Sequence, residues 1–293
     1  MINLQREKKT LLVYKRSAYE IYFLKRDSSF QRQRDHIKAS DIRPFKLSHF
    51  EHYKTLAYIE KILRAQKIPY QKYSRSRKID YSPYEFIISV GGDGTFLEAA
   101  RSLTNQAILG VNSDTVRSVG RFCAADRNNF AKILDRYFQG EAPIKELTRL
   151  RLKMRDQNRA VNITNDLLIC HSNPAAMSRY LIEVNGVKEK HYSSGIWIST
   201  AAGSSGAIKS AGGKILPMDS HLMQFLSREL YEKKGKQYQL KHGVLKINKP
   251  VKVTSLMRNG SVYADGCHVR FPFHFGEVAE ITPAKDPLRI VHP

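Results

Sequence analysis

One segment constrains the fold of this 293-residue chain more than any other, namely FIISVGGDGTFLEAA at residues 86–100. Its first five residues are a continuous apolar run, which is typical of a strand buried on both faces of a parallel sheet. A glycine-rich turn follows, and the residues from Thr95 onward are typical of a helix. A second apolar run, AILGV, comes next at residues 107–111. Strand, helix and strand in this order predict a parallel βαβ unit, and therefore an α/β fold in this part of the chain.

The remainder of the chain divides into two parts of different character. The N-terminal part holds a predicted strand, KTLLVYK at residues 9–15, and a predicted helix over residues 49–66. Beyond Leu147 the sequence alternates between apolar and polar residues, which is typical of antiparallel strands. The Asn-Gly pairs at 185–186 and 259–260 each predict a hairpin.

These patterns predict two domains, as the chain length also suggests. We expect residues 1–125 to form an α/β domain with a parallel sheet that carries the glycine-rich turn. We expect residues 126–293 to form a β-rich, substrate-binding domain that starts with a helix over 128–138, and its last residues to pack back on the first domain.

Composition excludes several classes of protein. Hydrophobic residues make up 42% of the chain, which is enough for a sizeable core, so we expect a folded protein. No apolar run approaches the roughly 20 residues needed to cross a bilayer, and the N-terminus lacks the apolar core of a secretory signal. The three cysteines are far apart and odd in number, so they fit neither a disulfide framework nor a zinc site. We therefore expect a cytoplasmic protein with no membrane partner and no metal held by its side chains.

The chain is strongly basic. Its formal net charge of +22 comes from 49 basic and 27 acidic residues, and such a field attracts polyanions. Nucleic acid, nucleotides and polyphosphates are candidates, and a solvated basic surface without any partner fits the charge equally well. The sequence has no zinc-finger spacing, no aromatic RNA-binding signature and no heptads, so no nucleic acid partner is expected.

The glycine-rich turn has the features of a phosphate site. Gly91 and Gly92 fall at the carboxyl end of a predicted parallel strand, where ligands of such sheets bind. The helix that begins near Thr95 offers free N–H groups and a dipole that favour a phosphate. Asp93 adds a carboxylate that can accept a proton from an attacking hydroxyl or help to hold a metal ion. The alternative is a plain turn in which Asp93 caps the helix.

Three further places carry polar residues beside predicted strands. Asn165 and Asp166 precede the apolar run LLI, and an amide beside a carboxylate can hold the two hydroxyls of a ribose, although a turn cap fits the same spacing. The stretch SSGIWISTAAGSSGAIKSAGG at 193–213 runs from a strand into small residues that leave room for a flat ligand, whereas a flexible linker is the alternative. Asn112 follows AILGV at another carboxyl strand end, so a substrate contact is expected there.

The motif GGDGT resembles the signature of a kinase superfamily that contains NAD kinases, diacylglycerol and sphingosine kinases and, more distantly, phosphofructokinases. The Asn-Asp pair and the Ser/Gly-rich stretch follow it in the order found in NAD kinases. The segments AILGVNSD, GRFCAADRNNF and STAAGSSGAIKSAGGKILP are most similar to the plant NADH kinase branch and its bacterial relatives. Weaker similarity covers most of residues 55–290.

The resemblance implies an enzyme that transfers a phosphoryl group from ATP or polyphosphate to the 2′-hydroxyl of the adenosine ribose of NAD⁺ or NADH. It implies Mg²⁺ or another divalent cation, an α/β domain followed by a β-rich domain, and a homodimer or homotetramer. Asp93 would be the catalytic carboxylate. The substrate and nucleotide site would be formed by Gly91, Gly92, Gly94, Thr95, Asn112, Asn165, Asp166, Ser194, Thr200, Gly203, Ser204, Ser205 and Ser210.

Two departures from the family pattern fall where the dinucleotide should lie. Ser194 stands where many NAD kinases have aspartate, and Ser205-Gly206-Ala207 replaces Thr-Ala-Tyr. Both bear on the choice between NAD⁺ and NADH. Two other functions remain open from the sequence: a lipid kinase of the same superfamily, and a nucleotide- or nucleic-acid-binding protein without catalysis.

Overall fold

The computed structural model describes residues 9–24 and 37–292. The residues up to Lys145, together with those from Arg289 onward, form one compact unit, and Glu146–Leu288 form the second. The predicted boundary at residue 125 precedes helix α4 (Phe130–Gln139), whereas the first unit continues through this helix. The prediction that the chain lacks a secretory signal concerns its first residues, of which 1–8 lie outside the described part. In the part that the structure describes, no helix is long and apolar enough to span a membrane.

A seven-stranded sheet forms the centre of the first unit. Its order is β2-β1-β3-β4-β19-β6, and β5 also pairs with β4. The pairs β1–β2, β1–β3, β3–β4, β4–β5 and β4–β19 are parallel. The predicted βαβ unit is confirmed, because α3 (Asp93–Ala100) connects β3 to the parallel strand β4. The strands are β1 (Thr10–Tyr14), β2 (Tyr70–Ser74), β3 (Phe86–Gly91), β4 (Ala107–Asn112), β5 (Cys123–Ala125), β6 (Ile144–Leu147) and β19 (Leu288–Val291).

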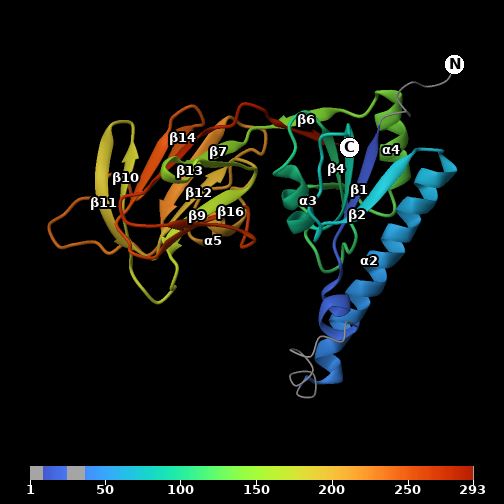
Figure 1. The fold of residues 1–293 in the computed structure, drawn as a ribbon, viewed down its shortest axis with the longest axis horizontal. Helices are drawn as coiled ribbons and strands as arrows, with labels where there is room; N and C mark the ends of the chain where they lie inside the picture. Colours follow the sequence, from blue (N-terminus) through green and yellow to red (C-terminus); the bar gives the residue numbers. More distant parts are fainter. Residues whose placement is uncertain (1–8, 25–36, 293) are drawn as a thin grey trace. The chain divides into compact units, whose positions relative to one another are not determined.

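Helices cover both faces of this sheet. In Figure 1, α2 (Ala39–Ala65) and α4 lie on one side of the sheet and α3 lies on the other. Alternate residues of β3 supply the apolar surface under α2 and α4, with Phe86 and Ile88 fully buried there. Helix α2 begins earlier than the predicted start at residue 49 and contains Pro44 in its second turn, where it gives up one backbone hydrogen bond. A short π-helix, η2 (Glu20–Leu24), precedes it.

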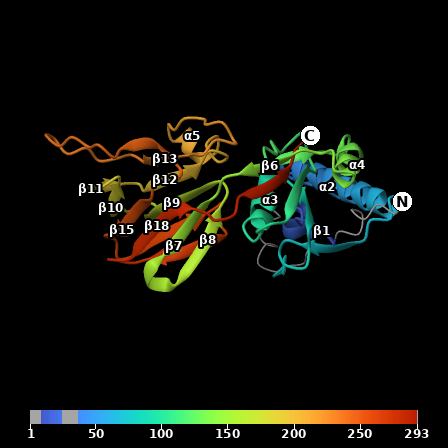
Figure 2. The same cartoon turned by 90° about the horizontal axis from the view of Figure 1, so that it is seen from above.

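The second unit consists of two antiparallel sheets around a shared apolar core, so the predicted β-rich part is confirmed. The strand orders are β11-β10-β15-β18-β7-β8 and β14-β13-β12-β9-β16-β17. Figure 2 shows the two sheets as layers, with β15 and β18 in one and β12 and β13 in the other. The elements are β7 (Leu150–Met154), η3 (Arg155–Gln157), β8 (Arg159–Ile163), β9 (Asp166–His171), β10 (Ser178–Val184), β11 (Val187–Ser193), β12 (Ile196–Thr200), α5 (Ala207–Ser210), β13 (Leu222–Ser227), β14 (His242–Lys246), β15 (Val251–Ser255), β16 (Gly260–Ala264), β17 (Val269–Phe273) and β18 (Val278–Pro283).

Only one of the two predicted Asn-Gly hairpins forms. Asn185 and Gly186 have φ of 50° and 81° and join β10 to its partner β11, as expected of a two-residue hairpin turn. The second prediction is wrong, because β15 and β16 belong to different sheets. Gly260 instead begins β16, where a Cβ would overlap the carbonyl oxygen of Phe273. That glycine is needed for close strand approach, which the dipeptide pattern does not distinguish from a turn.

Candidate active site

The glycine-rich turn joins β3 to α3 in the first unit. Gly92 is the N-cap of α3 and has an extended backbone. A Cβ on Gly91 would overlap Thr95 Oγ1, and a Cβ on Gly92 would stand 2.5 Å from Ser118 Oγ. The turn therefore needs these two glycines because neighbouring side chains close in on the backbone, and not because of a left-handed conformation.

A buried hydroxyl at this turn lacks a partner. Thr95 is 1% exposed, and its Oγ1 has no hydrogen-bond partner among the described residues. Buried polar groups are nearly always hydrogen-bonded, so an unpaired hydroxyl in the first turn of a helix fits an absent ligand. An anion is the ligand that a helix N-terminus favours.

Asp93 is held firmly at the same turn. Its Oδ2 accepts a hydrogen bond from the backbone N–H of Arg121 at 3.1 Å, and its Oδ1 accepts one from Phe122 at 2.9 Å. Asp93 is the first residue of α3, and no side chain of the described residues caps this helix. The structure therefore does not show Asp93 acting as the cap of α3, which was the alternative interpretation. The two amides fix the carboxylate in one orientation beside the turn.

Two cations that were not predicted as site residues lie near this turn. Arg75 follows β2, and its Nη1 would stand 3.5 Å from a Cβ on Gly94. Lys15 follows β1, where burial and the neighbouring Arg75 charge lower the pKa of its ammonium group. Glu98 balances part of this charge, because its Oε2 lies 3.4 Å from Arg75 Nε. Lys15 ends the strand predicted over residues 9–15, which was the available signal for it, since the carboxyl ends of parallel strands meet at one sheet edge. No strand was predicted before Arg75, so its place at this edge could not be inferred.

Asn112 has a structural task at the end of β4. Its Nδ2 donates to the Ser118 carbonyl at 2.9 Å, and its Oδ1 accepts from the Asp114 N–H at 3.2 Å. The side chain therefore shapes the loop that follows β4. It also lines a small pocket of about 50 Å³ against α2, together with Thr55 and Arg127. A substrate contact at Asn112 stays a prediction.

In the second unit, the half-buried Asn165 and the buried Asp166 form a polar turn at the start of β9. Asn165 Nδ2 donates to Asp166 Oδ2 at 3.1 Å. Burial and the neighbouring Asp265 carboxylate raise the pKa of Asp166 to about 7. Asp265 accepts hydrogen bonds from the backbone N–H groups of Thr164 and Asn165, at distances of 2.7 to 3.2 Å. Asp265 was not among the predicted site residues, although its Asp-Gly pair after an alternating stretch is a turn signal.

The small-residue loop packs directly on this turn. The hydroxyl of Thr200, the last residue of β12, lies 2.6 Å from the Thr164 carbonyl oxygen and accepts from the Gly203 N–H at 3.0 Å. A Cβ on Gly203 would overlap the Asn165 carbonyl oxygen, and one on Gly206 would stand 3.4 Å from Asn165 Nδ2. The structure thus brings together two predicted motifs that lie 35 residues apart in sequence. The loop is bonded in place, which contradicts the flexible-linker alternative.

The serines of this loop are in different situations. Ser204 is buried and its hydroxyl bonds both the N–H and the carbonyl of Leu216, so it closes the loop. Ser205 is half-buried, and Ser210, at the end of α5, is exposed. Of these three serines, Ser205 and Ser210 expose surface that a ligand can contact.

Ser194 lies apart from these residues. It sits between β11 and β12, where its N–H donates to the Arg228 carbonyl at 2.9 Å. Thr200 ends β12 on the Asn165 side, so the strand separates Ser194 from the polar turn by roughly 20 Å, at about 3.3 Å per residue. Within one chain, the structure does not bring Ser194 to the other predicted contacts.

No metal centre is formed by side chains in the described ranges, where no three His, Cys, Asp or Glu side chains gather as metal ligands. The three cysteines are unpaired thiols.

The parallel sheet, the glycine turn at its carboxyl edge and the fixed carboxylate define an α/β protein of the phosphate-binding class, joined to a β-sandwich that carries a polar turn. The family model described as the ATP-NAD kinase N-terminal domain matches residues 10–142. A probable NADH kinase of Oryza sativa subsp. japonica is 34% identical over 231 residues, which cover 71% of each chain. The NADH kinase of Arabidopsis thaliana is 31% identical over 260 residues, covering 79% of this chain and 80% of the plant protein. The chain belongs to the NAD kinase family.

Two solved structures share the fold. The NAD kinase from Archaeoglobus fulgidus in complex with ATP aligns with a TM-score of 0.70 at 20% identity, covering 97% of this chain and 93% of the other. The yeast NADH kinase complexed with NADH aligns with a TM-score of 0.66 at 14% identity, covering 98% and 83%. At these identities the likeness concerns the fold alone.

Proposed function

We infer that the protein is an NAD(H) kinase, which phosphorylates the 2′-hydroxyl of the adenosine ribose of NAD⁺ or NADH and so produces NADP(H). The observation that carries this inference is the Asp93 carboxylate, fixed by two backbone amides beside a glycine turn whose buried Thr95 hydroxyl lacks a partner. A fixed acceptor next to an anion site is what phosphoryl transfer to a hydroxyl requires. The plant relatives, named as NADH kinases, support the same reaction.

In the proposed mechanism each motif has one task. The N-terminus of α3 and the Thr95 hydroxyl bind phosphates of the donor, and Lys15 and Arg75 add positive charge near them. Asp93 accepts the proton of the attacking hydroxyl. Asn165 and Asp166 hold ribose hydroxyls of the dinucleotide. A divalent cation, which we propose is Mg²⁺, supplies charge neutralisation on the phosphates.

The test is a product assay with the purified full chain. ATP and Mg²⁺ are supplied with NAD⁺, NADH, diacylglycerol or sphingosine, and the phosphorylated product is identified by mass spectrometry. NADP⁺ or NADPH is expected. A phosphorylated lipid, or no phosphorylated product from either dinucleotide, would overturn the assignment. Replacing ATP by polyphosphate in the same assay decides whether both serve as donor.

We further propose that NADH is used at least as well as NAD⁺. The nicotinamide ring is cationic only in NAD⁺, and Ser194 replaces the aspartate that would attract it. The backbone of Arg228 is hydrogen-bonded to Ser194 and Gly195, so a cationic residue lies next to this position. Ser194→Asp is expected to shift the ratio of kcat/KM values toward NAD⁺. An unchanged ratio would refute the electrostatic explanation, and a tenfold wild-type preference for NAD⁺ would refute the proposal itself.

We propose a homodimer or homotetramer as the working form. The supporting observation is that the length of β12 separates Ser194 from the Asn165 turn within a single chain. Light scattering of the eluting protein measures the mass. A monomer with full activity would contradict this proposal.

A further inference from the structure

The outer face of the β10–β11 hairpin gathers cations around one aromatic ring. Arg179 pairs with Tyr192 across the hairpin, and Lys190 lies two residues before Tyr192 on the same strand face. The Tyr192 ring centroid is 6.0 Å from Arg179 Cζ, 5.3 Å from Lys190 Nζ and 5.1 Å from Lys233 Nζ. Cations over an aromatic face are attracted to it, so the ring holds three positive groups in one place.

The segment that supplies Lys233 is bound along β11, an edge strand of its sheet. The Tyr231 N–H donates to the Tyr192 carbonyl at 2.8 Å, and Lys236 Nζ donates to the Lys190 carbonyl at 3.4 Å. Lys236 Nζ also lies 4.4 Å from the Tyr238 ring centroid. These contacts place Lys233 and Lys236 beside the hairpin.

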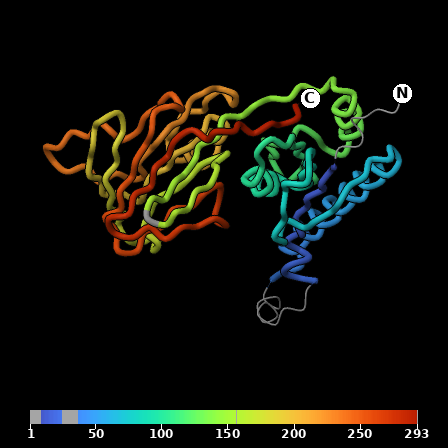
Figure 3. Tube along the Cα trace, turned by 45° about the horizontal axis from the view of Figure 1, so that its top comes forward, coloured from blue at the N-terminus to red at the C-terminus, as the bar shows by residue number. Residues whose placement is uncertain are grey.

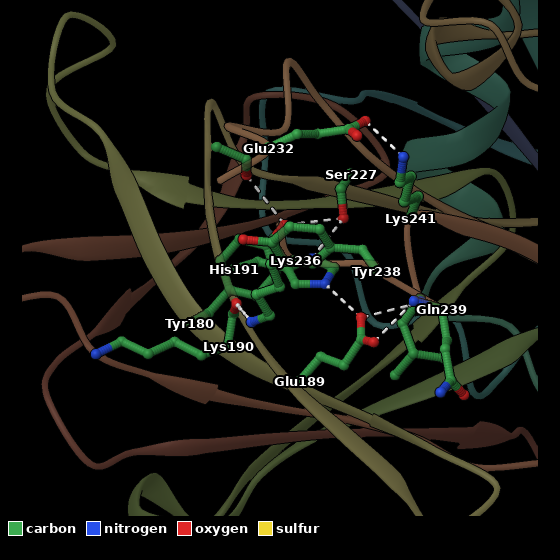
Figure 4. Close-up of polar contacts among 12 residues, drawn as sticks. Tyr180, Glu189, Lys190, His191, Ser227, Glu232, Lys236, Tyr238, Gln239 and Lys241 are labelled. Carbon is green, nitrogen blue, oxygen red and sulfur yellow. Dashed lines mark hydrogen bonds and ion pairs between the residues drawn. The ribbon is translucent and has the colours of Figure 1, made fainter. Parts of the chain in front are cut away.

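A buried relay anchors the far end of this segment (Figure 4). Glu189 accepts hydrogen bonds from the backbone N–H groups of Gln239 and Leu240, at 2.7 and 3.0 Å. Its Oε2 also lies 3.1 Å from Nε2 of the fully buried His191, and His191 Nδ1 lies 2.9 Å from Ser227 Oγ. Burial lowers the pKa of His191, so the ring is neutral at pH 7. The neutral ring then donates to Glu189 and accepts from Ser227.

Three carboxylates of the hairpin and the adjoining segment are committed to other groups. Glu189 points inward to the relay. Glu232 Oε1 pairs with Lys241 Nζ at 2.6 Å, and Glu183 Oε1 lies 3.9 Å from Lys252 Nζ. The surface made by Arg179, Lys190, Tyr192, Lys233 and Lys236, here termed the tyrosine–lysine patch, is therefore positive.

The arrangement of rings and cations in the tyrosine–lysine patch favours polyphosphate over single-stranded nucleic acid. Single-stranded nucleic acid binds through bases stacked on free aromatic faces as well as through its phosphates. Here the Tyr192 ring is engaged by three cations, and Tyr238 is 8% exposed and lies beside Lys236. The rings therefore position positive charge and do not offer stacking platforms. We propose that the tyrosine–lysine patch binds a linear inorganic polyphosphate chain, at a site in the second unit of the chain separate from the glycine turn.

The experiment compares two charge-matched double variants of the full chain. Lys190→Gln/Lys233→Gln removes two patch cations, whereas Lys241→Gln/Lys252→Gln removes two cations that pair with Glu232 and Glu183. The probe is end-labelled polyphosphate of about 100 units, measured by fluorescence polarisation at several salt concentrations. The patch variant is expected to bind about tenfold more weakly than wild type at low salt and with a shallower salt dependence, since each exposed contact contributes a modest, screened amount. The control variant is expected to stay within about threefold of wild type.

Two results would overturn the proposal. One is equal weakening by the two double variants, which would show a response to net charge alone. The other is single-stranded DNA of matched phosphate content that binds the wild type as tightly as polyphosphate does. NADP formation from ATP and NAD⁺ is measured on the same samples and is expected to be unchanged in both variants. Because that readout is independent of polyphosphate binding, failure of the kinase assignment and failure of the patch are distinguishable.

Discussion

At the scale of single residues, Asp93 is the side chain on which the proposed chemistry depends most. Asp93→Asn keeps an acceptor oxygen for one of the two backbone amides but loses the ability to accept a proton. We expect kcat to fall by roughly 10² to 10⁴, the usual contribution of general-base catalysis, with only a small change in Tm. Asp41→Asn, at an exposed position of α2, serves as the control. A variant within threefold of the wild-type kcat would show that the carboxylate is only structural.

Asp166 gives a prediction about pH. Its pKa is about 7 in the folded chain, raised by burial and by Asp265, whereas an unfolded aspartate titrates near 3.9. Between these values the folded state binds more protons than the unfolded state, so the free energy of unfolding falls as pH rises. The loss from this residue is up to about 4 kcal/mol and is complete above pH 7. Asp166→Asn removes this pH-dependent loss, so the variant gains stability relative to wild type as pH rises.

Urea unfolding at pH 5 and pH 8 measures this difference. The advantage of Asp166→Asn over wild type is expected to be larger at pH 8. Asp219→Asn, at an exposed position, is the matched substitution for comparison. An equal difference between Asp166→Asn and wild type at the two pH values would contradict the assignment of the raised pKa.

At the scale of elements, the contact between the small-residue loop and the Asn165 turn sets a steric limit. A Cβ on Gly203 would overlap a backbone oxygen, whereas one on Gly206 meets its nearest atom at 3.2 Å. We expect Gly203→Ala to cost about 1–3 kcal/mol of unfolding free energy, as overpacking does, and to raise KM for the dinucleotide. Gly206→Ala is the matched control. It should lower the free energy of unfolding less and raise KM for the dinucleotide less than Gly203→Ala does. An equal loss of unfolding free energy in the two variants would show that the loop accommodates a Cβ at Gly203 without strain.

Sequence and structure agree best where the pattern is contiguous. The strand, glycine turn and helix around Asp93 are predictable because each element is specified by neighbouring residues. Asp265 is not predictable in this way, since it lies 100 residues from the amide of Asn165 that it binds. Its place depends on the pairing of β16 with β9, which brings Ala264 opposite Leu167. Ser194 is separated from the polar turn by the length of β12, a distance that motif order does not reveal.

At the scale of the whole molecule, the chain crosses between its two units twice. It leaves the first unit after Lys145 and returns at Arg289, as the trace in Figure 3 follows. The returning strand β19 pairs with β4, with Ile290 opposite Ile108. Ile290→Ala is expected to cost about 2–5 kcal/mol, the usual range for a buried isoleucine. Amide hydrogen exchange should rise in β4 and stay unchanged in β12, and a uniform rise in both units would contradict this local role.

The same strand has a consequence for synthesis. A ribosome delivers β4 well before Arg289 and Ile290, the residues that pair with Ala107 and Ile108 and lie about 180 positions further along the chain. At about 5 to 20 residues per second, the start of β4 waits roughly 10 to 35 s for its partner. During that interval a nascent chain presents an unpaired apolar strand edge, which is a site where other chains can add. The edge of β4 is therefore open to such pairing until β19 has been made.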